Sequence, residues 1–169
     1  EYWIARNVAV SCFVFTKINK EWCILANKRG NKTPDFQGLW NCPCGYLDFD
    51  ETTEQAAKRE VFEETGIELS YVKFWGFDDN PNSNLQNITF RYYSFIYNPN
   101  FNLNTNAKSR GGEDGEVSEV KWIPIKDINE YDWEENNDIS ELQQAMALFM
   151  IDSIENITIE ELKSLRNRL

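Results

Sequence analysis

Apolar and polar residues alternate in blocks along most of the chain, and the apolar blocks are rich in β-branched and aromatic residues. Blocks of this composition are typical of β-strands. Two of them, 7–18 and 21–28, are separated only by Asn19-Lys20 and are predicted to form a hairpin. Further strands are predicted at 39–44, 71–77, 86–97 and 117–125. The polar stretches between them, above all 29–38 and 98–115, are predicted loops.

Three further segments have the pattern of helices. Thr52 and Gln55, three residues apart, fit a capping box, and Gly66 stands where a C-terminal cap is expected. Apolar residues also recur at helical spacing over 139–151 and 158–168. Strands on both sides of one central helix predict a single α/β domain over residues 1–169. Its core is expected at about 7–130 and its C-terminal helices at about 138–168.

The charge and the residue composition restrict the kinds of binding and catalysis that this protein can carry out. The chain has 169 residues, with 17 basic and 28 acidic side chains and a formal net charge of −11. This balance disfavours a protein that binds long nucleic acids, which requires clustered Lys and Arg. The chain contains no histidine, which excludes Ser-His-Asp and Cys-His catalysis as well as imidazole-bound metals. Acid and base chemistry therefore falls to carboxylates, Lys, Tyr or Cys.

The sequence favours a cytoplasmic protein without a membrane anchor. No apolar run reaches the ~18 residues that a membrane helix needs, and no basic segment before an apolar one indicates a signal peptide. The chain begins at Glu1 rather than Met, so upstream residues are not accounted for. The four cysteines are Cys12, Cys23, Cys42 and Cys44. They are expected to be reduced thiols, because the C-x-C spacing of the last two is not that of a zinc site.

The segment 45–67 carries the clearest chemical signal. At ~100° per residue, Glu60, Glu63 and Glu64 fall within one arc of the predicted helix. Like charges at this spacing destabilise an isolated helix. Three carboxylates on one face of a helix suit a hard divalent cation such as Mg²⁺, which also binds phosphates. The loop 45–50 leads into the helix N-terminus, where backbone N–H groups favour anions. A metal and phosphate site is therefore predicted, the alternative being a solvated helix face.

The same segment resembles the Nudix box of the Nudix hydrolase (MutT-like) family. The matching positions are Gly45, Glu51, Arg59-Glu60, Glu63-Glu64 and Gly66, with aliphatic Val61 and Ile67. The resemblance extends more loosely from about Asn7 to Asn129. It implies an α/β/α sandwich with a mixed β-sheet, in which the box forms loop–helix–loop, here with added C-terminal helices. It also implies an enzyme that hydrolyses the pyrophosphate linkage of a nucleoside diphosphate joined to another moiety, with Mg²⁺ or Mn²⁺.

Residue roles inside the box follow from this resemblance. Glu60, Glu63 and Glu64 are implied as metal ligands or base, the last two as direct ligands and Glu60 as ligand or water activator. Glu51 is implied to support the metal shell, and Arg59 to orient a neighbouring glutamate.

Two further metal ligands are implied outside these side chains. The residue before the box glycine offers its backbone carbonyl; here it is Cys44, where the family most often has glycine. An additional acidic ligand is expected from the Gly-rich stretch 111–116, first at Glu116 and then at Glu113, although an exposed acidic loop is the alternative.

A nucleotide-type small molecule is the expected substrate. Phe36 and Tyr46 are candidates to stack on a base, and Gln86 is a candidate to bind a base edge or ribose. Gly45 is a further candidate, because a residue without a side chain lets the substrate approach the backbone closely. The sequence does not decide between nucleoside triphosphates, nucleoside diphosphate sugars, dinucleoside polyphosphates and capped RNA ends.

Two other roles stay open. A Nudix fold can bind a nucleotide or nucleotide sugar as a sensor without hydrolysing it, although such members usually lose box glutamates and this chain keeps them. The C-terminal helices carry an apolar stripe that could pair two subunits in a homodimer or pack on the protein's own sheet. The residues of this stripe are Leu142, Met146, Phe149 and Met150.

Overall fold

The computed structural model of the chain describes residues 5–82, 86–97 and 115–134, which belong to one compact unit spanning residues 1–134. The predicted C-terminal helices, their apolar stripe, Glu113 and nearly all of the predicted loop 98–115 lie outside the described residues. No helix in the described part is both long enough and apolar enough to cross a membrane.

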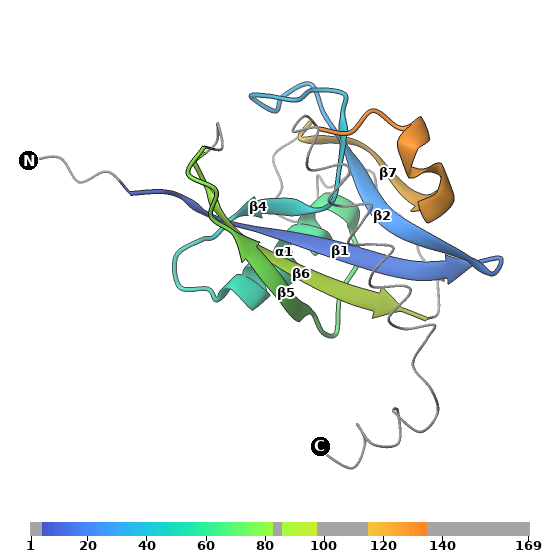
Figure 1. Cartoon of the computed structure of the whole chain (residues 1–169), viewed down its shortest axis with the longest axis horizontal. Coiled ribbons are helices and arrows are strands. Elements are labelled where there is room, and N and C mark those ends of the chain that lie inside the picture. Colours follow the sequence, from blue (N-terminus) through green and yellow to red (C-terminus); the bar gives the residue numbers. More distant parts are fainter. Residues whose placement is uncertain (1–4, 83–85, 98–114, 135–169) are drawn as a thin grey trace, which may run out of the picture. The chain divides into compact units, whose positions relative to one another are not determined.

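In the described residues the fold is a mixed sheet of seven strands with one α-helix on it, arranged as in Figure 1. The strands run in the order β3-β2-β1-β6-β5, while β4 pairs with β1 and β7 pairs with β2. The pairing of β1 with β6 is parallel and the others are antiparallel, so the predicted mixed sheet is confirmed. The strands are β1 Val8–Ile18, β2 Glu21–Arg29, β3 Trp40–Asn41, β4 Cys44–Tyr46, β5 Lys73–Asp78, β6 Ile88–Ile96 and β7 Val117–Pro124.

The hairpin of β1 and β2 turns at Asn19-Lys20, as predicted. Both residues have positive φ angles, of 51° and 72°, the conformation of a tight two-residue turn that matches the twist of the strands. This turn places β1 at the centre of the sheet, with β2 and β4 along one side of it and β6 along the other.

The predicted strand 39–44 is wrong in one respect, because it is two short strands. Trp40 and Asn41 pair with β2, whereas Cys44 pairs with Ser11 in β1. The chain crosses between these neighbours at Cys42-Pro43, where the Pro43 carbonyl accepts a hydrogen bond from the Cys12 N–H at 2.9 Å. Proline has no N–H to donate to a neighbouring strand. The chain therefore changes its partner strand at a residue where no backbone N–H bond is lost.

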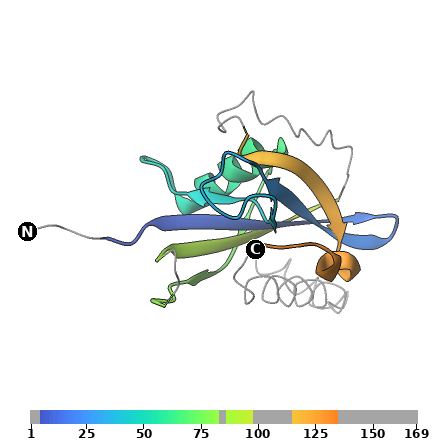
Figure 2. The same cartoon turned by 90° about the horizontal axis from the view of Figure 1, so that it is seen from above.

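Helix α1 (Thr53–Thr65) forms between the two predicted caps. The Thr52 side chain accepts from the Gln55 N–H, the Gln55 side chain accepts from the Thr52 N–H, and Gly66 is left-handed at φ 75°. Ala56, Ala57 and Val61 are fully buried in the main hydrophobic cluster with residues of β1. The short 3-10 helix η2 (Ile125–Glu130) lies on the opposite side of the sheet from α1 (Figure 2). Burial of Ala56, Ala57 and Val61 fixes which face of α1 packs on the sheet.

Candidate active site

Gly45 of β4 lies directly against the carboxylate of Glu60 of α1. A Cβ atom at Gly45 would lie only 2.1 Å from Glu60 Oε1 and 2.5 Å from its Oε2. The φ angle of Gly45 is not positive, so this position requires glycine for space rather than for backbone conformation. The first residue of the box thus leaves room for the carboxylate of one of its glutamates.

The Arg59 guanidinium lies among three acidic side chains of the box. Its Nη2 is 2.7 Å from Glu51 Oε1, and its Nη1 is 2.7 Å from Glu60 Oε1 and 3.0 Å from Glu63 Oε2. Nη2 also donates to the Tyr46 carbonyl at 2.9 Å, which joins α1 to the end of β4. The hydrogen bond from Arg59 lowers the pKa of Glu51. Arg59 therefore holds several carboxylates at defined positions, rather than the single one expected from sequence.

Glu60 and Glu64 are held in surroundings that disfavour their charge. The side chain of Glu60 is only 12% exposed, and burial raises its pKa to about 7 even though Arg59 acts in the opposite direction. Burial also raises the pKa of Glu64 well above its ordinary value, and the charge of Glu60 adds to this effect. One oxygen of Glu64 accepts the Cys44 N–H at 3.0 Å. A cation placed beside these two carboxylates would stabilise their charged forms.

The donor set fits a hard divalent cation in its chemistry, although its side chains are engaged with other partners. Within the described residues, no group of three or more acidic or cysteine side chains is gathered around a common point. Instead, Glu60 and Glu63 bind Arg59 while Glu64 binds the Cys44 N–H. The three carboxylates and the Cys44 carbonyl supply the oxygen ligands that Mg²⁺ and Mn²⁺ prefer. Binding therefore requires Glu60 or Glu63 to exchange Arg59 for the metal. The four cysteines are free thiols.

Glu116, the additional ligand expected outside the box, lies close to this site. Burial is the main cause of the raised pKa of both Glu60 and Glu64, and the charge of Glu116 adds to it. Its backbone carbonyl accepts the Gly30 N–H at 2.6 Å. The start of β7 is thus joined to the end of β2 beside the carboxylates.

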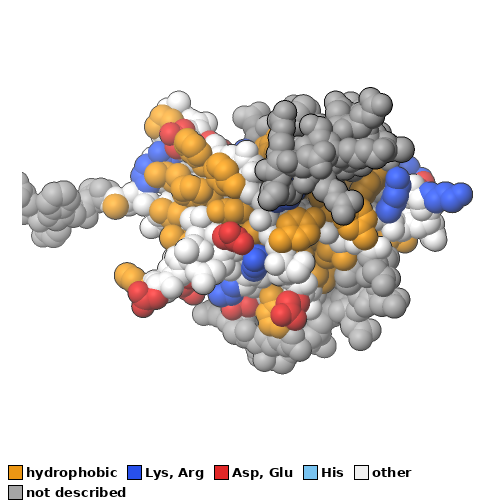
Figure 3. Space-filling model, turned by 90° about the horizontal axis from the view of Figure 1, so that it is seen from below, with side chains coloured by type: hydrophobic (Ala, Val, Ile, Leu, Met, Phe, Trp, Pro, Cys, Tyr) orange, Lys and Arg blue, Asp and Glu red, His pale blue; other side chains and the backbone are white. Residues whose placement is uncertain are grey.

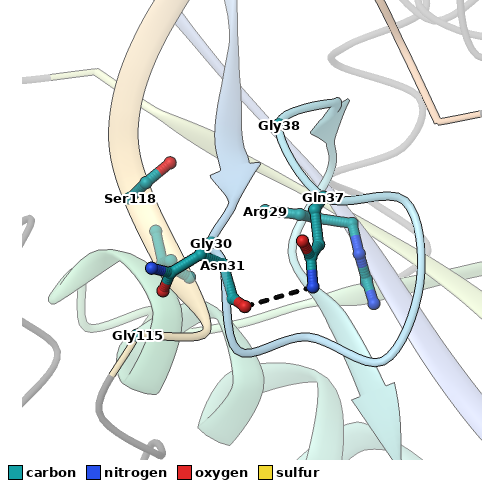
Figure 4. A pocket seen from close by; sticks show the side chains of 8 residues that line it. Arg29, Gly30, Asn31, Gln37, Gly38, Gly115 and Ser118 are labelled. Carbon is teal, nitrogen blue, oxygen red and sulfur yellow. Dashed lines mark hydrogen bonds between the residues drawn. The ribbon is translucent and has the colours of Figure 1, made fainter.

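An open pocket of about 560 Å³ lies between the loop that follows β2 and the start of β7 (Figure 4). Its lining is glycine-rich and includes four polar side chains; the residues are Arg29, Gly30, Asn31, Gln37, Gly38, Gly115, Val117 and Ser118. The Gln37 side chain donates to the Asn31 carbonyl at 3.1 Å. This pocket was not predicted from the sequence, because a pocket formed by two distant segments leaves no local pattern.

The candidate substrate-binding residues are scattered around the site. Phe36 lies in the loop after β2, beside the pocket-lining Gln37 but not in the lining itself. Tyr46 ends β4 rather than lying in a loop, and is 55% exposed. Gln86 lies between β5 and β6, where its side chain donates to the Pro81 carbonyl at 2.6 Å and its own carbonyl accepts from Arg6. Their contacts with substrate stay predictions.

Gly30 provides a test of how tightly the pocket is built. A Cβ at this position would lie 1.9 Å from the Gly115 carbonyl oxygen, an atom of the backbone that cannot swing aside. We expect Gly30→Ala to lower the free energy of unfolding by about 1–3 kcal/mol, the cost of overpacking a close contact, as measured by urea denaturation. Gly76→Ala is the matched control, since nothing lies within 4 Å of that position. Equal stability of the two variants would contradict the close approach.

Comparison with known proteins agrees with this architecture. A mixed sheet that carries a capped helix with this series of glutamates defines a Nudix-type protein. The family model of the NUDIX domain matches residues 5–143, and the chain belongs to this family.

Curated relatives match at low to moderate identity. The chain is 24% identical over 152 residues to Nudix hydrolase 6 of Arabidopsis thaliana, covering 89% of this chain and 50% of that protein. It is 40% identical over 53 residues to the NAD-capped RNA hydrolase NudC of Haemophilus influenzae, covering 31% of this chain and 20% of that protein. The chain thus spans half or less of the length of these two relatives.

Solved structures share the fold. The NUDIX domain of Shewanella oneidensis NrtR, complexed with ADP ribose, aligns with a TM-score of 0.67 at 21% identity, covering 87% of this chain and 90% of that domain. The Ap4A hydrolase of C. elegans aligns with a TM-score of 0.60 at 17% identity, covering 86% and 98% of the two chains. Identities this low establish the common architecture and leave the substrate to be argued from the site.

Proposed function

We propose that this protein is a hydrolase that cleaves the pyrophosphate linkage of a nucleoside diphosphate joined to another moiety. The observation that carries the proposal is the arrangement around Glu60. Its carboxylate occupies the space left by Gly45, is bonded by Arg59, and lies close enough to Glu64 for its charge to disfavour the charged form of Glu64. A solvated helix face would not bury like charges against one another.

Glu60, Glu63, Glu64 and the Cys44 carbonyl are the groups that would hold Mg²⁺ or Mn²⁺. When bound, the metal supplies neutralisation of the diphosphate charge and lowers the pKa of water. The protein itself holds the carboxylates in place: Arg59 bonds Glu60 and Glu63, and the Cys44 N–H bonds Glu64. These bonds keep the carboxylates on one side of α1, and a bound metal would take the place of Arg59 at Glu60 or Glu63.

A box glutamate is proposed to take the proton from the attacking water. Glu60 is the candidate for this role, because burial raises the pKa of its carboxyl and so favours uptake of a proton. As the water oxygen bonds to one phosphorus, the bridging P–O bond breaks and the phosphate leaves with the electron pair. The proton stays on the glutamate until it is passed to solvent.

The pocket beside Glu116 is the proposed place for the part of the substrate that is not phosphate. Its volume of about 560 Å³ is within the usual range for small-molecule sites. The backbone contact between Gly30 and Glu116 joins this pocket to the carboxylates. A substrate could therefore span the two, with its diphosphate beside α1 and its remaining moiety between the β2 loop and β7.

A product-release screen tests the proposal and identifies the substrate class. Purified protein is incubated with nucleoside triphosphates, nucleoside diphosphate sugars, dinucleoside polyphosphates and capped RNA, each with Mg²⁺, with Mn²⁺ and with EDTA. We expect hydrolysis of at least one class with metal and none with EDTA. Failure with every class would contradict the proposal.

A second candidate function is nucleotide or nucleotide-sugar binding without hydrolysis. It is favoured by one observation, the NrtR NUDIX domain that holds ADP ribose. The complete set of box glutamates in this chain favours hydrolysis instead. Saturable binding of ADP ribose with no product formed in Mg²⁺ or Mn²⁺ would support the sensor.

Metal affinity is expected to depend on pH. A protonated carboxyl does not bind a metal, and the pKa of Glu60 is raised to about 7, so below this pH the metal must displace a proton. We expect Mn²⁺ to bind about tenfold more tightly at about pH 8 than at about pH 6, measured by titration of the Mn²⁺ EPR signal. Glu60→Gln should show a smaller pH dependence. The same affinity at both pH values would contradict the assignment of Glu60.

A further inference from the structure

The segment after η2 returns to the sheet and runs beside β3. The Trp40 N–H donates to the Asp132 carbonyl at 2.8 Å, and the Glu134 N–H donates to the Trp40 carbonyl at 2.9 Å. Trp40 and Trp133 form a parallel bridge. These backbone bonds fix Glu134 next to Asn41, although 93 residues separate the two along the sequence.

The Glu134 carboxylate is the first member of a chain of contacts that leads into the candidate active site. Its Oε2 accepts a hydrogen bond from Asn41 Nδ2 at 2.5 Å, and the same nitrogen lies 3.1 Å from Cys44 Sγ. The Cys44 N–H in turn donates to Glu64 Oε2 at 3.0 Å. Glu134 thus orients the Asn41 amide, which contacts the residue that bonds Glu64.

The same oxygen of Glu134 also faces Arg29 of the pocket lining. Arg29 Nη1 lies 3.7 Å from Glu134 Oε2, while Arg29 Nη2 makes a closer ion pair with Asp35 at 2.6 Å. The Glu134 side chain is only 13% exposed. Burying a carboxylate is costly unless it is paired and hydrogen-bonded. Here its shortest hydrogen bond comes from the neutral Asn41 amide, which offsets little of the free-energy cost of burying the charge.

We propose that Glu134 is a positioning residue of the active site, acting through Asn41 on Cys44 and so on the Glu64 carboxylate. This inference rests on the proposed hydrolysis, because it assigns Glu134 to the same site. Glu134 acts without touching the substrate or its phosphates. Hydrogen-bonded neighbours of metal ligands are worth about 10–100-fold in activity or metal affinity.

The test compares three variants with the wild-type chain on the best substrate of the screen. Glu134→Ala removes the acceptor of the Asn41 amide, and we expect kcat to fall about 10–100-fold and Mn²⁺ to bind about tenfold more weakly, with KM within about twofold. Glu134→Gln keeps an oxygen acceptor and should retain kcat within about threefold of wild type. Asp132→Ala is the control, because Asp132 is exposed and contributes only its backbone carbonyl to β3.

Three outcomes would overturn the inference. Unchanged kcat and Mn²⁺ affinity in Glu134→Ala would remove the role while leaving the wild-type hydrolysis intact. A raised KM with unchanged kcat would instead identify Glu134 as a substrate contact. Equal losses in Glu134→Gln and Glu134→Ala would mean that the hydrogen bond is not the cause.

A further variant covers failure of folding, and metal binding covers failure of the proposed function. If urea denaturation shows Glu134→Ala to be unfolded, Asn41→Ala removes the donor of the same hydrogen bond and is judged by the same readouts. If the wild-type chain hydrolyses nothing, the proposed function fails. In that case Mn²⁺ titration alone decides whether Glu134 positions the carboxylates.

Discussion

Glu64→Gln is expected to lower kcat by about 10²–10⁴ while the fold is retained, the range for losing acid–base or metal assistance. Glutamine keeps an oxygen that can accept the Cys44 N–H, the bond that Glu64 Oε2 makes at 3.0 Å. The substitution removes the negative charge of Glu64, a carboxylate on which the charges of Glu60 and Glu116 also act. The measurement is steady-state hydrolysis at saturating Mg²⁺, with urea denaturation to confirm folding.

Glu54→Gln is the matched control for this substitution. Glu54 lies on the first turn of the same helix, is mostly exposed, and pairs with Lys58 at 3.0 Å. Exposed pairs at this spacing contribute about 0.3–0.5 kcal/mol, so its loss should leave kcat unchanged. Full metal-dependent activity in both Glu63→Gln and Glu64→Gln would contradict the roles assigned to the box.

Gly45→Ala is expected to reduce activity much more than stability. The new methyl group would take the place of the Glu60 carboxylate, whose oxygens lie 2.1 and 2.5 Å from that position. The Glu60 side chain can move its far end aside, so we expect the free energy of unfolding to change by less than about 1 kcal/mol. The displaced carboxylate loses its 2.7 Å contact with Arg59, and we expect kcat to fall about 10–100-fold.

Paired measurements of kcat and urea stability on Gly45→Ala and Gly76→Ala separate these effects. Gly76 has open space around it, so alanine there should leave kcat at the wild-type value. Wild-type activity in Gly45→Ala would show that the position of Glu60 is not needed for hydrolysis.

The sequence predicted the elements whose causes are local. The capping box at Thr52 and Gln55 and the left-handed Gly66 define helix α1 through contacts between residues a few positions apart. The Asn19-Lys20 turn follows from a similarly short-range pattern. The mixed sheet followed from the family resemblance, whereas the strand order and the parallel pairing of β1 with β6 were not predicted.

In the edge strand β5, successive side chains do not alternate regularly between the two faces of the sheet. In β5 the register shifts between Phe74 and Gly76, and this bulge turns Phe74 and Phe77 to the same face, where both rings lie 6.2 Å from Phe90. Alternation would have placed these rings on opposite faces. Both are more than half exposed. Apolar side chains also lie at the surface between charged ones on the face drawn in Figure 3.

The parts of the site that the sequence missed depend on distant segments. The contact of Asn41 with Glu134 joins a two-residue strand to a segment 93 residues away, and the pocket forms only because Gly30 and Gly115 approach each other. Neither pairing has a local signature. Arg59 was expected to orient one glutamate, yet it contacts Glu51, Glu60 and Glu63 together, because the loop before α1 folds back on the helix.

Anomalous diffraction from crystals soaked in Mn²⁺ tests whether the three box glutamates bind a metal. We expect a metal peak at the carboxylates of Glu60, Glu63 and Glu64, with the bonds from Arg59 to Glu60 or Glu63 broken to admit it. No peak at these residues at Mn²⁺ concentrations that support hydrolysis, or a peak only elsewhere on the molecule, would contradict it.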